Sequence, residues 1–279
     1  MKRTVGTEPY FTAPDLSRRC VDFAASLLDM DAFALMVEPG AGAGAFLRHL
    51  PPDRRLGMDI EPRHPAIRRA DFLAWRPPAG TGPVLTIGNP PFGQRGALAM
   101  RFLDHACGFS DAVAFILPRS FRKWTFENRV DPFFHLAGSF DCEEFHDGDG
   151  RSRSVRTVFQ VWQRQPAPRV IVEPPGSHPD FEMFHAHLSR VDEAERARLR
   201  RDYTFTVPQV GADFRPRDVA TVTRGSHWFI RPLAAGVRER FERLDFGFLA
   251  GMNTAHTSLS KSDIVAAYVA TGATGADGA

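Results

Sequence analysis

The sequence Asn-Pro-Pro-Phe at positions 89–92 combines hydrogen-bond acceptors with an aromatic ring in a rigid stretch of chain. Prolines lack an N–H group and restrict the preceding residue to extended geometry, so the side-chain amide of Asn89 and the backbone carbonyl of Pro90 are held in place. These two acceptors would bind both N–H hydrogens of an aromatic amine and turn the nitrogen lone pair toward an electrophile. Phe92 would hold the ring that carries the amine by stacking, which contributes about 1–3 kcal/mol per base. A proline-rich turn with a buried Phe92 is the alternative that the motif alone leaves open.

Two apolar runs are expected to position this motif. The β-rich run at 84–87 ends just before it, which is typical of a strand that stops at a turn. A second apolar run at 34–37 is followed by a glycine-rich turn and by an expected helix over 46–50. A strand, a glycine-rich turn and a helix in this order are typical of the start of a nucleotide-binding βαβ unit.

Acidic residues follow the expected strand ends. Glu38, just before Gly40, would repel a pyrophosphate but suits a cationic ligand. Asp59 lies about 20 residues after Gly40, at the end of an expected second strand, where a carboxylate binds ribose hydroxyls. Asp71 and Phe72 would take the amine and the face of an adenine. As isolated acids, Asp59 and Asp71 would more often be helix caps or solvated turn residues.

Taken together, these segments resemble class I S-adenosylmethionine-dependent methyltransferases of the N6-adenine type, with the motif order of the gamma (TaqI-like) class. The segment at 10–14 resembles the motif that covers the methionine end of the cofactor, and Glu-x-Gly-x-Gly at 38–42 resembles the cofactor glycine loop. Asp59 is similar to the ribose-binding acid and 71–72 to the adenine-binding pair. The segment at 89–92 resembles the catalytic motif, in which Tyr is frequent at the last position and Phe is a variant.

The resemblance implies roles for individual residues. It implies that S-adenosyl-L-methionine is the cofactor and that no metal is needed. The catalytic residues would be Asn89, Pro90 and Phe92. The cofactor-binding residues would be Thr12, Pro14, Glu38, Pro39, Gly40, Gly42, Asp59, Ile60, Asp71, Phe72 and Asn89.

The expected fold class is α/β. Further strands are expected at 112–117, 133–140 and 157–162. The resemblance, which covers roughly residues 8–165, implies a Rossmann-like doubly wound, mostly parallel seven-stranded sheet with an antiparallel last strand. We expect a catalytic domain over 1–165, a small α+β substrate-recognition region over 166–270 and a disordered tail over 271–279.

Basic residues follow two of the expected strands where the sheet would bind ligands. Their convergence on one rim suggests contact with the phosphate backbone of a nucleic acid. Acidic neighbours, Asp141 among them, count against a purely basic patch, and an ordinary solvated loop is the alternative. The residues are Arg119, Arg122, Lys123, Arg151, Arg153 and Arg156.

The C-terminal region is much smaller than the target-recognition domain of a typical gamma-class enzyme. Helices are expected at 191–202 and 236–244, with Ser260 capping a third over 263–270. The expected short strands lie at 170–172, 203–210, 213–223 and 228–232.

Composition sets limits without choosing a function. Of 279 residues 43% are hydrophobic, which is ample for a core, and the net charge of +2 does not by itself indicate nucleic-acid binding. Three cysteines without metal spacing predict buried thiols and a reducing, cytoplasmic location. No membrane-spanning run or signal peptide is recognisable. His185 and His187 lack a further ligand at metal spacing.

The sequence therefore predicts transfer of a methyl group from S-adenosylmethionine to the N6 amine of adenine in DNA or RNA. One alternative is a protein glutamine N5-methyltransferase, because release-factor methyltransferases use a similar motif on a primary amide. The other is a non-catalytic nucleic-acid-binding module with a methyltransferase fold. The sequence separates neither DNA from RNA nor one oligomeric state from another.

Overall fold

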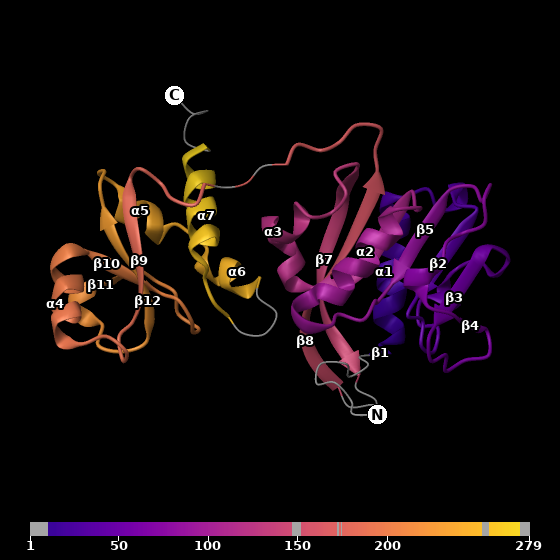
Figure 1. The fold of residues 1–279 in the computed structure, drawn as a ribbon, viewed down its shortest axis with the longest axis horizontal. Coiled ribbons are helices and arrows are strands. Elements are labelled where there is room, and N and C mark those ends of the chain that lie inside the picture. Colours follow the sequence, from indigo (N-terminus) through magenta and orange to yellow (C-terminus); the bar gives the residue numbers. More distant parts are fainter. Residues whose placement is uncertain (1–10, 147–151, 172, 174, 253–256, 274–279) are drawn as a thin grey trace. The chain divides into compact units, whose positions relative to one another are not determined.

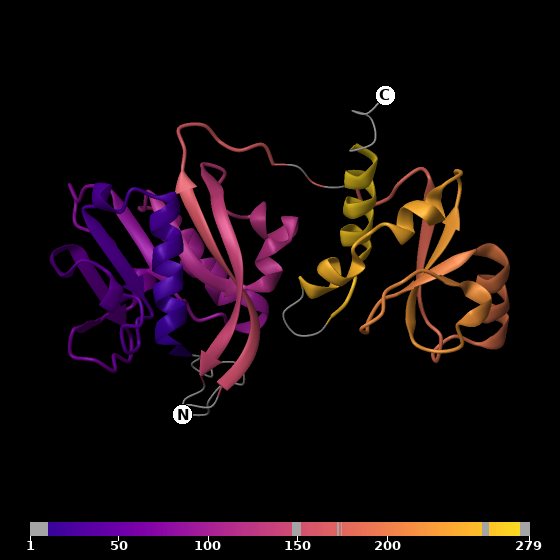
Figure 2. The same cartoon turned by 180° about the vertical axis from the view of Figure 1, so that it is seen from behind.

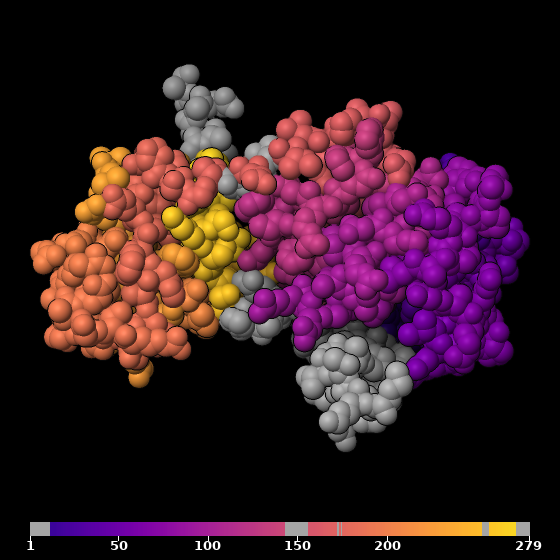
Figure 3. Space-filling view, in the orientation of Figure 1, coloured from indigo at the N-terminus to yellow at the C-terminus, as the bar shows by residue number. Residues whose placement is uncertain are grey.

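The computed structural model describes residues 11–146, 152–171, 173, 175–252 and 257–273. The chain forms two compact units, Met1–Ile171 and Val172–Ala279, where the sequence suggested a division after residue 165. Figure 1 shows the elements of each unit, and Figure 3 shows their surfaces. The described helices include none that is both long and apolar enough to cross a membrane.

The first unit is built on one mixed sheet in the order β1-β7-β8-β6-β5-β2-β3-β4 (Figure 1). Strands β6, β5, β2, β3 and β4 run parallel, and β8 is antiparallel to both of its neighbours. Apart from the two-residue β1, this is the seven-stranded, mostly parallel sheet with an antiparallel last strand that we predicted. The strands are β1 Phe11–Thr12, β2 Leu35–Pro39, β3 Arg55–Asp59, β4 Ile67–Arg69, β5 Val84–Gly88, β6 Ala112–Pro118, β7 Phe134–His146 and β8 Ser152–Arg164.

Helices cover both faces of this sheet. Every residue of β5 and β6 is buried, as expected for parallel strands that are apolar throughout. Helix α1 (Pro14–Leu27) packs on one face of the sheet (Figure 2). Its buried residues Leu16, Cys20 and Ala24 recur at helical spacing. Helices α2 (Ala97–Cys107) and α3 (Trp124–Glu127) lie on the other face. The core therefore has two layers, one on each side of the sheet.

The connection between β2 and β3 differs from the prediction. Only a single 3₁₀ turn, η2 (Leu47–His49), forms where a helix over 46–50 was expected, and a second, η3 (Pro52–Arg54), follows. The reason is local, because Pro51 disfavours helical geometry at Leu50 and the ring of a proline cannot continue the helix.

The second unit is a four-stranded antiparallel sheet in the order β11-β10-β12-β9. On one face of this sheet, Leu199 of α4 packs with Phe229 of β12. Helices α5, α6 and α7 cover the other face. The strands are β9 Phe181–His187, β10 Phe205–Pro208, β11 Arg217–Asp218 and β12 Ser226–Pro232. The helices are α4 Glu193–Asp202, α5 Val237–Glu242, α6 Phe246–Gly251 and α7 Lys261–Ala273.

Most of the expected elements of this unit are present. Ser260 caps α7 as predicted, since its Oγ accepts from the backbone N–H of Asp263 at 3.2 Å. The expected strand at 170–172 is absent at 170 and 171, and residue 172 lies outside the described part. Only Arg217–Asp218 is a strand within 213–223. Residues 271–273 of the predicted disordered tail belong to α7, and 274–279 lie outside the described residues.

The three cysteines are buried free thiols, as predicted. Their burial raises the pKa of each thiol, so they remain protonated and behave as small apolar side chains.

Candidate functional site

The glycine turn after β2 lies against the Asn-Pro-Pro-Phe motif after β5. Because β2 and β5 are parallel neighbours, their carboxyl ends meet at the same edge of the sheet. Gly40 has φ +62°, and a Cβ at this position would lie 3.4 Å from Cδ of Pro91. The left-handed backbone favours glycine here, and the 3.4 Å spacing shows that the turn lies in van der Waals contact with the motif. The fold joins the two segments that the sequence singled out.

Glu38 holds this turn from inside. Its two carboxylate oxygens accept hydrogen bonds from the backbone N–H groups of Phe46 (3.0 Å) and Leu47 (2.6 Å). The residue is 3% exposed, and its burial raises the pKa of the carboxyl group to about 7, although both hydrogen bonds lower it. This geometry does not favour the predicted direct contact with a cationic ligand, because the carboxylate is buried and both of its oxygens point to backbone N–H groups of the chain. Glu38 positions the glycine turn.

Asp59 ties the same turn to β3. Its Oδ2 accepts from the backbone N–H of Gly42 at 2.8 Å, and its Oδ1 accepts from the N–H of Glu61 at 2.8 Å. A carboxylate has about four lone-pair sites, so these two bonds leave acceptor capacity for ligand hydroxyls. The side chain is half-buried, and the neighbouring Ile60 is 65% exposed. Asp59 thus lies at the strand end and beside the turn, as predicted.

Of the pair at 71–72, Asp71 lies at the surface and Phe72 lies in the core. Asp71 is exposed, and its Oδ1 accepts from the N–H of Leu73 at 2.9 Å, which caps the short 3₁₀ helix η4 (Phe72–Ala74). Phe72 is only 3% exposed, with ring centroids 5.2 Å from Phe102 and 5.0 Å from His105. The predicted stacking of an adenine on the Phe72 ring is therefore wrong, because the core already covers that ring.

The Asn-Pro-Pro-Phe motif is anchored by a distant residue. The Nδ2 of Asn89 donates a hydrogen bond of 3.1 Å to the Oγ1 of Thr12. Pro90 is buried, whereas Phe92 is half-buried and packs against both core layers. The motif is thus held from several sides while Phe92 keeps part of its ring exposed.

The N-terminal segment reaches the same edge through β1. Thr12 pairs with Phe145 near the end of β7, and Pro14 is the first residue of α1. Tyr10, which the resemblance includes, lies outside the described residues.

The basic rim forms in part as predicted. Pro118 at the end of β6 pairs with Thr157 of β8, which brings Arg119 and Arg156 to the same edge. Arg119 and Arg122 both form ion pairs with Asp141 of β7. Lys123 follows the 3₁₀ helix η6 (Arg119–Arg122). Arg151 lies outside the described residues, and of Arg153 only the strand position is described.

Two further residues near these segments were missed from the sequence. A Cβ at Gly57 would lie 2.6 Å from Cδ1 of Ile67, so this glycine makes room for the Ile67 side chain of the neighbouring strand β4. A glycine inside a strand can signal close packing of this kind. The indole Nε1 of Trp124 is buried without a hydrogen-bond partner in the described part of the chain, and nothing in the sequence indicates this.

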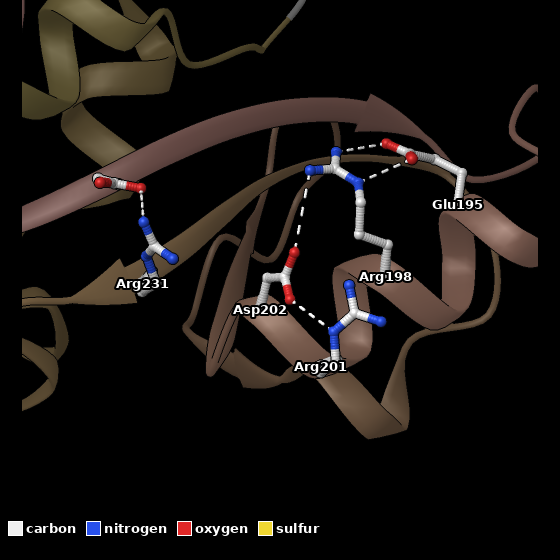
Figure 4. Close-up of polar contacts among 6 residues, drawn as sticks. Glu195, Arg198, Arg201, Asp202 and Arg231 are labelled. Carbon is white, nitrogen blue, oxygen red and sulfur yellow. Dashed lines mark hydrogen bonds and ion pairs between the residues drawn. The ribbon is translucent and has the colours of Figure 1, made fainter.

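Several arginines of the second unit form ion pairs with neighbouring acids. Arg198 forms ion pairs with Glu195 and Asp202 on α4 (Figure 4). Arg201 pairs with Asp202, and Arg231 pairs with Glu182. Within the described residues, no three His, Cys, Asp or Glu side chains are grouped to hold a metal ion.

No family model and no curated protein matches the sequence. Solved structures with a detectable likeness include the putative RNA methyltransferase PH1948 from Pyrococcus horikoshii, with 18% identity over 59% of this chain and 91% of that chain (TM-score 0.45). They also include the 23S rRNA methyltransferase ErmE, with 18% identity over 58% and 72% (TM-score 0.41). A third is the N-methyltransferase NodS from Bradyrhizobium japonicum WM9, with 15% identity over 55% and 99% (TM-score 0.37). At these scores, the likeness supports no conclusion about a cofactor or a substrate.

Proposed function

We propose that the first unit transfers a methyl group from S-adenosylmethionine to the N6 amine of adenine in a nucleic acid. The observation that carries this proposal is the packing of the Gly40 turn against Pro91 beside the anchored Asn89. This arrangement places a cofactor-type glycine turn next to a motif suited to an aromatic amine, at the edge of the sheet where α/β folds bind ligands.

The residues at this edge fit the cofactor. Gly40 offers backbone without a side chain, and Asp59 offers a carboxylate with remaining acceptor capacity for ribose hydroxyls. Asp71 is exposed and would accept from the adenine amine of the cofactor. The other residues of this proposed site are Thr12, Pro14, Pro39, Gly42 and Ile60, with Glu38 acting through the turn that it holds. When bound, the cofactor supplies an electrophilic methyl group.

The chain's own residues would act by positioning. The Asn89 side-chain oxygen and the Pro90 carbonyl accept the two N–H hydrogens of the target amine, which weakens conjugation of its lone pair with the ring. Phe92 holds the target base through the exposed part of its ring. Fixing the amine near its electrophile is a large source of rate enhancement and requires no covalent intermediate. Because these groups act on a single base, the target adenine must be single-stranded or turned out of its stack.

The nucleic acid would be held along the basic rim. Arg119, Arg122 and Arg156 are described there, and Lys123, Arg151 and Arg153 belong to the same stretches of sequence. Contacts of this kind with phosphates supply affinity without base specificity. A methylation assay that offers both DNA and RNA distinguishes the two kinds of strand.

The test is a methylation assay with the full chain. Isotopically labelled S-adenosylmethionine is offered with DNA, tRNA, rRNA, capped RNA or a release factor, and the products are digested to nucleosides or peptides. We expect label in N6-methyladenine or its deoxy form. Label in glutamine would support the protein-methyltransferase alternative instead. Failure to bind S-adenosylmethionine by calorimetry would leave the non-catalytic alternative.

A further inference from the structure

A single carboxylate bridges two arginines at the basic rim. Asp141 on β7 lies 3.0 Å from Nη2 of Arg119 through Oδ2, and its Oδ1 accepts from Nε of Arg122 at 2.9 Å. Each oxygen of the carboxylate therefore serves one arginine. Two guanidinium groups that converge on two oxygens of one anion form an arrangement that suits a carboxylate and a phosphate equally well.

The three side chains differ in exposure. The side chain of Asp141 is 42% exposed, whereas those of Arg119 and Arg122 are 16% and 23% exposed. The arginines are thus held against the protein while the anion lies on the outside. Because the Asp141 carboxylate is partly exposed, water can solvate its charge when it moves away, so its displacement costs less than that of a buried acid.

Other charges at this edge also favour the binding of an anion from outside the protein. Arg156 directly precedes Thr157, the β8 residue that pairs with Pro118, and its Nη1 is buried without a hydrogen-bond partner among the described residues. Glu127 on α3 also lies within range of the charge of Arg122, and burial raises its pKa. Among the side chains that the structure describes at this edge, Arg119, Arg122 and Arg156 outnumber Asp141 and Glu127, and the Asp141 carboxylate is exposed.

We propose that Asp141 occupies the position of a backbone phosphate between Arg119 and Arg122, and that a nucleic-acid phosphodiester binds there by displacing it. This inference rests on the proposed function, since it takes nucleic acid as the ligand of the rim. Asp141 thereby competes with every phosphate for the same two arginines. Asp141 lowers the affinity of the rim for nucleic acid in general. Only strands that make additional contacts with the protein then bind tightly.

Binding of fluorescein-labelled single-stranded DNA and RNA oligonucleotides to the full chain tests this inference. Fluorescence anisotropy at about 50 mM and 200 mM salt would show the electrostatic part of the affinity. We expect Asp141→Asn to bind about five- to tenfold more tightly at low salt, because one negative charge next to the phosphate is removed. The gain should shrink at the higher salt concentration.

Matched variants separate this effect from a general change of charge. Asp31→Asn removes an acid that pairs with Arg54 before β3, at the opposite edge of the same sheet, and should leave binding unchanged. Arg122→Gln should weaken binding and should cancel most of the gain of Asp141→Asn in the double variant. Asp141→Ser serves as a second replacement should the asparagine variant fold poorly in a thermal melt.

Equal or weaker binding by a folded Asp141→Asn protein would overturn the inference and would assign Asp141 to holding the arginines in place. If the protein methylates adenine but Asp141→Asn shows no gain in affinity, the inference is wrong and the proposed function stands. A protein that gains affinity without methylating adenine would retain the anion site and sink the proposed reaction.

Discussion

The side-chain amide of Asn89 donates a hydrogen bond of 3.1 Å to the hydroxyl of Thr12, although 77 residues separate the two in sequence. An amide has a donor end and an acceptor end, and binding the donor end to Thr12 sets the orientation of the group. Thr12 therefore determines how the Asn89 oxygen is presented. In the proposed reaction, Thr12 acts as a positioning residue in addition to its expected contact with the cofactor.

Thr12→Val should lower kcat about fivefold to tenfold, because the loss of one hydrogen bond of about 1 kcal/mol lets the amide rotate. Thr12→Ser keeps the hydroxyl and should retain most of the activity. Steady-state kinetics give kcat, and calorimetry gives the affinity for S-adenosylmethionine. A loss in cofactor affinity as large as the loss in kcat would assign Thr12 to cofactor binding alone.

Asn89→Ala should abolish methyl transfer, with a loss of at least about 100-fold, since it removes one of the two acceptors for the target amine. Cofactor affinity measured by calorimetry should stay close to that of the wild type. If the variant loses cofactor binding to the same extent as activity, the role given to Asn89 in holding the amine is wrong.

Phe92→Ala should weaken binding of the target base by about 1–3 kcal/mol, as loss of a stacking face does, whereas Phe92→Tyr keeps the face. Competition by short adenine-containing oligonucleotides measures this difference. Because Phe92 also packs against the core, thermal melts of both variants are the necessary control. Equal weakening by alanine and tyrosine would remove the stacking role.

Gly40→Ala should reduce both cofactor affinity and activity. Alanine at φ +62° is strained by roughly 1 kcal/mol, and its methyl group would lie 3.4 Å from Cδ of Pro91. Gly80→Ala is the matched control, because Gly80 has φ +82° with nothing within 4 Å of a Cβ. Both variants should lose similar stability in denaturant, and only Gly40→Ala should lose function. Similar loss of function in both would mean that strain alone matters.

Glu38 should make the free energy of unfolding depend on pH. Its burial raises the pKa to about 7 in the folded protein from the ordinary value of 4.5. Between these values, the folded state binds more protons than the unfolded chain, so the contribution of Glu38 to stability falls as pH rises through this window. The fall amounts to at most about 3 kcal/mol.

Denaturant unfolding at several pH values would measure this effect against Glu38→Gln. The glutamine variant does not titrate, so the stability of the wild type relative to the variant should decline from pH 4.5 to pH 7. The variant is expected to be less stable overall, because an amide offers only one acceptor to the N–H groups of Phe46 and Leu47. A difference that does not change with pH would contradict the raised pKa.

Much of the fold was predictable because its signals are local. The buried strands β5 and β6 are continuous apolar runs that end at prolines or glycine, so their positions follow from the sequence. The cap of α7 by Ser260 was predictable for the same reason. The helix expected over 46–50 does not form, although the reason is also local. Pro51 directly follows a short apolar run and prevents the helix that the run alone would favour.

The sequence by itself determined the rigid acceptor motif at 89–92, the glycine turn after β2 and the strand end that carries Asp59, because proline, glycine and apolar periodicity act over a few residues. Only the tertiary structure decided that Asn89 bonds to Thr12, that the Phe72 ring belongs to the core and that Asp141 lies between Arg119 and Arg122. Each of these outcomes depends on which distant strands become neighbours and on how their side chains fill the space between them. Packing of that kind is set by the whole sheet, and no local pattern of residues encodes it.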